Sequence, residues 1–342
     1  MSQQPIEIDD QEAPRSDDEG ETTEEAPPRM SSEPEHHSGS EESKTSTRSL
    51  SGSFLEEHFE NGRRYCNEIY YMPNDEPEQI RLAIVHQAYL PVLDGQLTLA
   101  RVPSSTRRIL DVGTGTGDWA MAMAERFNNA EIIATDITSV FQPGSGPPNV
   151  EFELDDAEEE WTYNDLFNFI HLRDMSGAFA DWNFIYAEVY KHLTIGGSVE
   201  IADHGMIQLK NEPPNSYVKA YNGALQSAAE KAGRPIGLEH LERLMIERAG
   251  LHFSRSRTFE VPLGTYPTDP VRKVAGKMAM IAALEGLEAV SLRLLTRHLA
   301  WKEEDVRNLC AKVQEEVMNP DARAFIPLQI VVYRKMMWTL PS

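Results

Sequence analysis

One glycine-rich segment constrains the fold of this 342-residue chain more than any other feature. It runs Asp111-Val-Gly-Thr-Gly-Thr-Gly-Asp118 and joins an apolar run at 107–112 to the stretch 118–127. A short apolar run that ends at glycines is typical of a buried strand, and the stretch after it is typical of a helix. A strand, a glycine turn and a helix in this order predict an α/β protein with a parallel sheet and right-handed crossovers.

The same rhythm continues along the chain. Further strands are expected at 130–137, 149–156, 167–174, 198–203, 251–264 and 326–335, and helices at 181–193 and 215–249. Residues 54–106 are expected to form an N-terminal helical cap, and 266–320 a helical insertion before the last strand. Together they predict one domain at 54–342. The insertion could lie over the carboxyl ends of the strands, where open α/β sheets bind ligands.

The N-terminal segment differs from everything after it. Residues 1–50 hold 14 Asp or Glu against 4 Lys or Arg, and no Phe, Tyr or Trp. Such a segment buries too little apolar surface to offset the entropy of ordering it. We therefore predict a disordered acidic tail at 1–53. It could be a regulatory, phosphorylated or partner-binding tail, or it could only solvate the protein.

Charge and composition exclude several classes of protein. The net charge of −23 argues against direct nucleic-acid binding, which needs clustered Lys and Arg. Two cysteines, Cys66 and Cys310, are too few for a disulfide scaffold, and no Cys/His cluster indicates a metal site. The chain shows neither a signal-peptide pattern nor an apolar run long enough to be a transmembrane segment. We expect a soluble intracellular protein without a metal.

The glycine spacing separates two kinds of nucleotide ligand. A dinucleotide fingerprint would place its third glycine at position 118, which is Asp118. The segment instead resembles motif I of the class I methyltransferases, with Asp111 two positions before Gly113. A carboxylate there suits the cationic amino-acid end of S-adenosylmethionine, whereas a pyrophosphate favours unopposed backbone N–H groups.

Acidic residues follow the next two strands as well. Asp136 can accept hydrogen bonds from both ribose hydroxyls, and Asp155 or Asp156 can face the adenine amine; we favour Asp156. The alternatives are a ligand-free turn for Gly113, Gly115 and Gly117, a helix cap for Asp136, and a solvated loop for Asp155 and Asp156. The predicted cofactor is S-adenosyl-L-methionine. Its predicted ligands in this region are Asp111, Gly113, Thr114, Gly115, Gly117, Asp136, Ile137, Asp156 and Ala157.

The fourth strand ends without a familiar catalytic element. Enzymes that methylate amino groups of nucleic-acid bases often carry Asn/Asp-Pro-Pro-Tyr/Phe there, whereas this chain has Ile-His171-Leu-Arg173-Asp174. His171 and Arg173 are weak catalytic candidates, because a lone His is more often structural and Arg173 can pair with Asp174. Met175 is expected to pack, and His204 is a weaker candidate still. The catalytic residue is left open.

Two groups of segments resemble one family. The chain is similar to LaeA-like fungal methyltransferases in an N-terminal group and a core group of segments. The first group is 60–65 (ENGRRY) and 71–76 (YMPNDE), and the second is the motif around 109–127 with the segments ATDIT, FNFIHLRDM and GGSVEIAD. The resemblance implies a Rossmann-like seven-stranded sheet of the class I methyltransferases, with N-terminal helices that cover the cofactor and place Arg64 and Tyr65 near it. It also implies transcription regulation in fungal development and secondary metabolism, in nucleus and cytoplasm, with velvet-type proteins or another methyltransferase subunit as partners.

Three functions compete at this point. The first is a methyltransferase that acts on a protein within a heteromeric complex. The second is a non-catalytic scaffold that keeps the fold and acts through partners. The third is a small-molecule methyltransferase, with 266–320 as its lid. The intact set of glycines and carboxylates favours an active enzyme.

Overall fold

The computed structural model describes residues 58–138, 141 and 146–337. The chain divides after Thr45, and all described residues belong to the unit Ser46–Ser342. The predicted tail at 1–53 lies outside the described residues, so its disorder stays a prediction.

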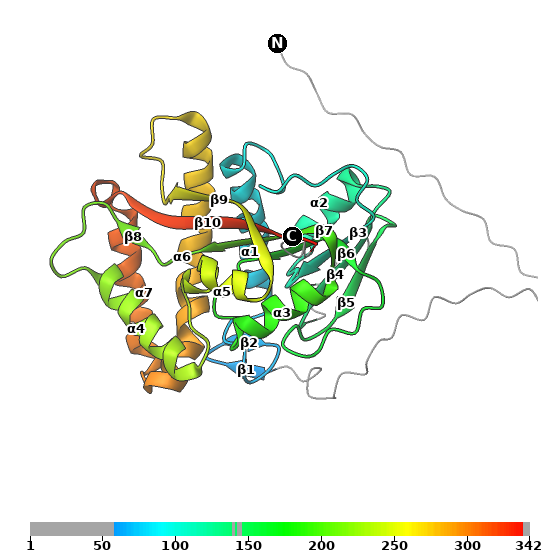
Figure 1. The fold of residues 1–342 in the computed structure, drawn as a ribbon. Coiled ribbons are helices and arrows are strands. Elements are labelled where there is room, and N and C mark those ends of the chain that lie inside the picture. The colour runs from blue at the N-terminus through cyan, green and yellow to red at the C-terminus, as the bar shows by residue number, and fades with distance from the viewer. Residues whose placement is uncertain (1–57, 139–140, 142–145, 338–342) are drawn as a thin grey trace, which may run out of the picture. The chain divides into compact units, whose positions relative to one another are not determined.

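An eight-stranded sheet forms the centre of this unit (Figure 1). Its strands are β3 (Arg108–Val112), β4 (Glu131–Asp136), β5 (Val150–Leu154), β6 (Phe167–Arg173), β7 (Leu193–His204), β8 (Gln208–Leu209), β9 (Leu251–Pro262) and β10 (Ala324–Lys335). The order is β5-β4-β3-β6-β7-β10, with β9 and the two-residue β8 both paired to β10. The first five strands are parallel, and β10 runs antiparallel to β7 and β9. Without β8, these are the seven strands that the resemblance implies, and the predicted α/β fold is confirmed.

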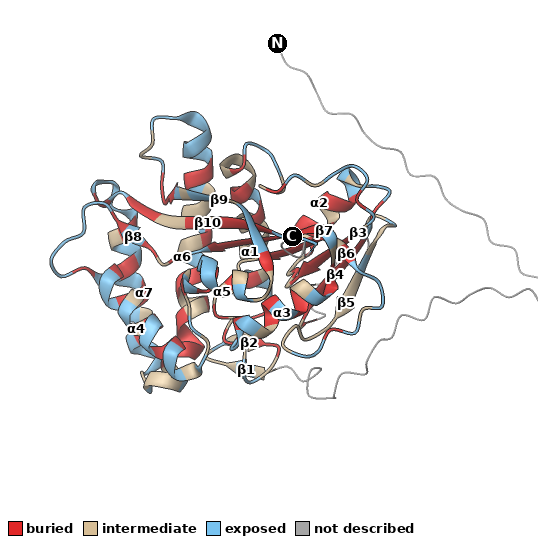
Figure 2. Ribbon diagram, in the orientation of Figure 1, coloured by how far each residue is buried: buried red, intermediate tan, exposed pale blue. Residues whose placement is uncertain are grey.

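Helices cover both faces of the sheet. They are α1 (Glu76–Val92), α2 (Asp118–Arg126), α3 (Trp182–His192), α4 (Tyr217–Ala232), α5 (Arg243–Arg248), α6 (Pro270–Leu299) and α7 (Glu303–Met318). Neighbouring residues of a strand point to opposite faces. Ile109 and Ile132 therefore pack with α2, while Leu110 and Ile133 pack with α3. The central strands are consequently buried on both faces (Figure 2), as their continuous apolar sequence predicts.

The N-terminal cap is only partly helical, which corrects the prediction for 54–106. Helix α1 is present, but β1 (His58–Glu60) and β2 (Arg63–Tyr65) form an antiparallel hairpin. Its turn is Asn61-Gly62, with φ of 51° and 74°. Asn-Gly is the preferred dipeptide for a two-residue hairpin turn, because both positions need positive φ. The pattern of apolar residues predicts helix across this segment and does not distinguish the hairpin.

The insertion at 266–320 is helical, as predicted. Helices α6 and α7 share an apolar cluster with α4, and α6 also packs along α1 (Figure 1). The 30-residue α6 starts at an Asp269 cap followed by Pro270. None of the helices in the described part of the chain is long and apolar enough to cross a membrane.

Candidate functional site

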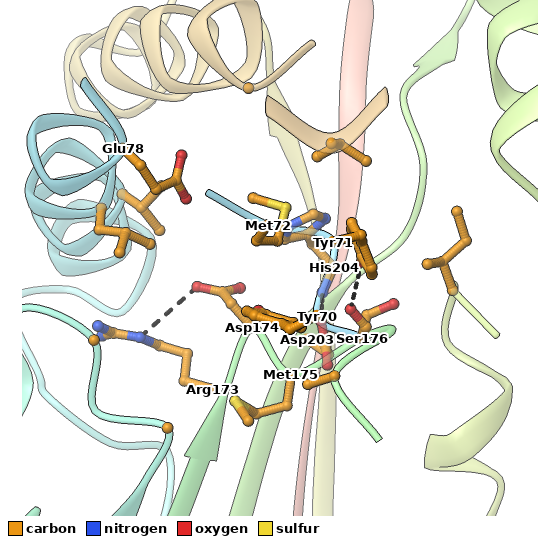
Figure 3. A pocket seen from close by; sticks show the side chains of 18 of the residues that line it. Tyr70, Tyr71, Met72, Glu78, Arg173, Asp174, Met175, Ser176, Asp203 and His204 are labelled. Carbon is orange, nitrogen blue, oxygen red and sulfur yellow. Dashed lines mark hydrogen bonds and ion pairs between the residues drawn. The ribbon is translucent and has the colours of Figure 1, made fainter. Parts of the chain in front are cut away.

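A large cavity opens at the carboxyl ends of the parallel strands. Its volume is about 710 Å³. The glycine loop, the ends of β4, β6 and β7, and helices α1, α4 and α6 all contribute to its wall. The insertion therefore lies over the strand ends, as the sequence analysis anticipated. Figure 3 looks into this cavity, where Tyr70, Tyr71, Glu78, Arg173 and Asp174 come together.

The glycine loop has the backbone that its sequence requires. Gly113, Gly115 and Gly117 have φ of 68°, 58° and 77°, a region that side chains with Cβ rarely adopt. A Cβ on Gly113 would lie 2.3 Å from Sδ of Met175. Gly113 and Gly115 line the cavity, together with Thr114. Gly117 is not among the lining residues, because it caps the start of α2, and its cofactor contact stays a prediction.

Asp136 is held at the rim of this loop. Its Oδ2 accepts a hydrogen bond from the Gly115 N–H at 2.8 Å, and its Oδ1 accepts one from the Thr138 N–H at 3.1 Å. Burial raises the pKa of Asp136 from 3.8 to about 6. A carboxylate has about four lone-pair sites, so Asp136 can accept a further hydrogen bond from a ligand. Asp136 and Ile137 line the cavity as predicted.

His171 supports Asp111. Its Nδ1 lies 2.7 Å from Asp111 Oδ1, and its ring stacks on Trp119 with centroids 3.7 Å apart. The other carboxylate oxygen of Asp111 accepts a hydrogen bond from the Thr114 hydroxyl at 2.7 Å. Burial lowers the pKa of His171, which is 2% exposed. This geometry favours a neutral His171 that fixes Asp111 and Trp119.

The third predicted acidic position, the pair Asp155-Asp156, also reaches the cavity. Asp155, Asp156 and Ala157 line it. Asp156 Oδ1 accepts a hydrogen bond from the Glu158 N–H at 3.0 Å, which shapes the turn after β5. Burial raises the pKa of both aspartates. The structure thus brings the three predicted carboxylate positions into one cavity.

The end of β6 forms a polar network on the other side of the cavity. Tyr89 donates a hydrogen bond from its hydroxyl to Asp174 Oδ1 at 2.6 Å. The Arg173 guanidinium lies 4.9 Å from the centroid of the Tyr89 ring and 3.9 Å from the Asp174 carboxylate. Arg173 also lies 3.4 Å from His86 Nδ1, and burial lowers the pKa of His86 to about 4. Arg173 lines the cavity, but its charge is already engaged.

Tyr65 is not among the residues that line the cavity, so the structure gives no support to its predicted contact with the cofactor. Its side chain is fully buried, and its ring faces the Arg293 guanidinium, 3.6 Å from the ring centroid. Arg64 is linked to the cavity through Asn74. Its Nε donates a hydrogen bond to Asn74 Oδ1 at 3.1 Å, and Asn74 lines the cavity.

Several lining residues escaped the sequence analysis. Tyr70, Tyr71 and Asn74 lie in the loop between β2 and α1, which carried only a family resemblance. Asp203 is the last residue but one of β7, and Asp136 is the last residue of β4, so a search for carboxylates near strand ends would have identified Asp203. The described residues contain no group of three or more His, Cys, Asp or Glu arranged for a metal ion.

Comparison with known proteins decides the family. A family model described as a methyltransferase domain matches residues 84–253. The chain is 36% identical to the secondary metabolism regulator LAE1 of Cochliobolus heterostrophus, over 81% of this chain and 94% of that protein. It is 33% identical to the methyltransferase pytC of Aspergillus terreus, over 85% of this chain and 92% of that protein. The chain belongs to the LaeA-like fungal methyltransferases. It is also 27% identical to the protein-methionine methyltransferase laeA of Emericella nidulans, over 81% of this chain and 76% of that protein.

The cofactor of this LaeA-like methyltransferase is S-adenosylmethionine, and the cavity fits it. Nine acidic residues line the cavity, against three arginines. Each arginine already faces one of those acids, as Arg81 faces Glu78, Arg173 faces Asp174, and Arg234 faces Glu158. The surplus of carboxylates suits a sulfonium and an ammonium group. Asp136 and Asp156 both line this cavity and stay the predicted partners of the ribose and the adenine.

Proposed function

We propose that this LaeA-like methyltransferase transfers a methyl group to a protein, and that the acceptor is the thioether of a methionine. The observation that carries the proposal is the absence of a free base at the end of β6, within the described residues. His171 is bound to Asp111, and Asp174 accepts the Tyr89 hydroxyl. A thioether needs no base, because its sulfur attacks with a lone pair and has no proton to lose.

The aromatic and sulfur-containing lining of the cavity supports the same choice. Tyr70, Tyr71 and Met72 face it from one wall, and Met175 from another (Figure 3). Thioethers make favourable contacts with aromatic rings. Transfer forms one C–S bond on the methionine and breaks one in the cofactor. The protein's part is to align the two sulfurs and exclude water.

Labelling of proteins tests this function. The purified chain is incubated with S-adenosylmethionine labelled in its methyl group and with fungal proteins. We expect labelled proteins with the unmodified chain and none with Asp136→Ala or Gly113→Val. Prior oxidation of the acceptor proteins to methionine sulfoxide should abolish labelling, because the sulfur lone pair is then less nucleophilic. Labelling that survives oxidation would refute a methionine acceptor.

A second candidate is a small molecule that carries a hydrogen-bond donor. Asn222 Oδ1 is buried without a hydrogen-bond partner and Asn222 lines the cavity, as does Asp203, whose Oδ2 lies 3.2 Å from His240 Nε2. Buried acceptors of this kind normally find a donor. Turnover with phenols or acids, lost on Asp203→Asn, would favour this candidate over a protein acceptor.

The regulatory role is also part of the proposal. We infer from the family that the chain regulates development and secondary metabolism in nucleus and cytoplasm, in a complex with a velvet-type protein or another methyltransferase. Co-purification from the fungus tests the complex, and microscopy of a tagged chain tests the location. An Asp136→Ala chain that loses cofactor yet restores metabolite production in a deletion strain would instead establish a non-catalytic scaffold.

A further inference from the structure

One wall of the cavity has no regular secondary structure to hold it. All nine residues from Cys66 to Asn74 line the cavity, and none belongs to a helix or strand. A segment without ladder hydrogen bonds needs other partners for its buried backbone groups. The wall segment, as we call residues 66–74, finds several of these partners on α6.

Arg293 of α6 reaches the wall segment from behind. Its Nη1 donates to the carbonyl oxygens of Asn67 at 2.6 Å and Tyr70 at 2.9 Å. Its Nε donates to Glu60 Oε2 at 3.0 Å, and its guanidinium lies over the Tyr65 ring. Arg293 is 1% exposed, although it is an arginine. Burial of such a charge is costly unless it is paired, so these contacts define its position closely.

A second arginine strengthens the same junction. Arg297, one turn along α6, donates to Glu60 Oε2 at 2.8 Å and to the Glu68 carbonyl at 2.6 Å. The two arginines share one carboxylate and together hold three carbonyls of the wall segment. Neither the hairpin nor the wall segment is close in sequence to α6, so the junction forms only in the folded chain.

The far end of the wall segment is linked through Thr138 to the carboxylate of Asp136. Asn74 Nδ2 donates to Thr138 Oγ1 at 3.1 Å, and the Thr138 N–H donates to Asp136. Tyr71, in the middle of the wall segment, donates from its hydroxyl to the Ser176 carbonyl at 3.1 Å. A displacement of the wall segment therefore changes the surroundings of Asp136 as well as the cavity's shape.

We propose that Arg293 is a positioning residue for the cofactor cavity, because it fixes the wall segment from the insertion helix α6. It touches neither cofactor nor acceptor and acts through the segment that does. The helical insertion thereby becomes part of the cofactor site. The proposal concerns the cofactor cavity and holds for any methyl acceptor.

Arg293→Lys separates charge from geometry. Lysine keeps the positive charge but lacks the planar fork that reaches Glu60 and two carbonyls at once. Arg108→Lys is the matched control. Arg108 pairs with Glu131 at 2.7 Å and lies over the Phe167 ring at 5.0 Å, but it sits at the start of β3, away from the strand ends that form the cavity.

Two measurements on the full-length chain test the proposal without any acceptor. Calorimetry gives the affinity for S-adenosylmethionine, and thiol labelling in a Cys310→Ser background gives the accessibility of Cys66, which is buried in the wall segment. For Arg293→Lys we expect at least tenfold weaker binding and at least tenfold faster labelling. For Arg108→Lys we expect a lower melting temperature with both values unchanged.

The outcomes separate positioning from general destabilisation. Arg293→Lys with the affinity and labelling rate of Arg108→Lys would overturn the proposal. Should Arg293→Lys not fold, Glu60→Gln loosens the same junction from its partly exposed side, with about threefold changes expected in both measurements. Unchanged values in Glu60→Gln would then overturn it. Because labelling of Cys66 requires no cofactor, the result is distinguishable from a failure of the chain to bind S-adenosylmethionine.

Discussion

We expect the ionisation of Asp136, a predicted cofactor ligand, to make cofactor affinity depend on pH. Its pKa of about 6 means that about nine-tenths of the carboxyl groups are charged at pH 7 and about one-tenth at pH 5. A protonated carboxyl accepts hydrogen bonds from ribose hydroxyls poorly. We therefore expect S-adenosylmethionine to bind about tenfold more weakly at pH 5 than at pH 7, or about 1.4 kcal/mol.

The same pKa has the opposite effect on the ligand-free fold. The folded chain holds the proton up to about pH 6, whereas the unfolded chain loses it near pH 3.8. The folded state binds more protons in this window, so the contribution of Asp136 to the unfolding free energy falls as pH rises from about 4 to about 6. The shift corresponds to about 3 kcal/mol.

Titration calorimetry at pH 7, 6 and 5, with urea unfolding at the same pH values, measures both effects. Asp136→Asn is the control, because it cannot ionise, and its weaker binding should vary little with pH. Equal affinity of the unmodified chain at pH 7 and pH 5 would refute the reasoning. An equally steep pH dependence in Asp136→Asn would assign the effect to another group.

Three further perturbations follow from the geometry. Gly113→Ala should weaken cofactor binding at least tenfold in calorimetry, and its positive φ should cost about 1–2 kcal/mol in urea unfolding. Adding Met175→Ala to this variant should relieve the contact of the new Cβ with Met175 Sδ at 2.3 Å but not the cost of the positive φ. His171→Gln should lower the melting temperature by several degrees without moving the pH profile of turnover, and a moved profile would make His171 an acid–base group. Burial raises the pKa of Glu200 to about 7 from 4.5, so the unfolding free energy should fall by about 3 kcal/mol as pH rises through that window. Glu200→Gln should remove this fall, and an unchanged pH dependence would show that Glu200 is not its source.

The sequence by itself determined the sheet and the polar residues at the carboxyl ends of its strands. The glycine loop and the acids Asp136 and Asp156 depend on local signals, since each follows a strand whose apolar run is visible in the chain. The carboxyl ends of parallel strands lie at one edge of the sheet, so the glycine loop, Asp136 and Asp156 must lie close together. The hairpin at Asn61-Gly62 also depends on a local signal, because its turn dipeptide favours positive φ at both positions.

Only the tertiary structure decided the other half of the site. The burial of Tyr65 under Arg293, the support of Asp111 by His171, and the wall segment held from α6 all join residues distant in the chain. Side-chain direction and pairing depend on packing between elements, and strand or helix periodicity carries no information about it. The sequence therefore specified which elements form the cavity, while long-range contacts of the folded chain chose which side chains face it.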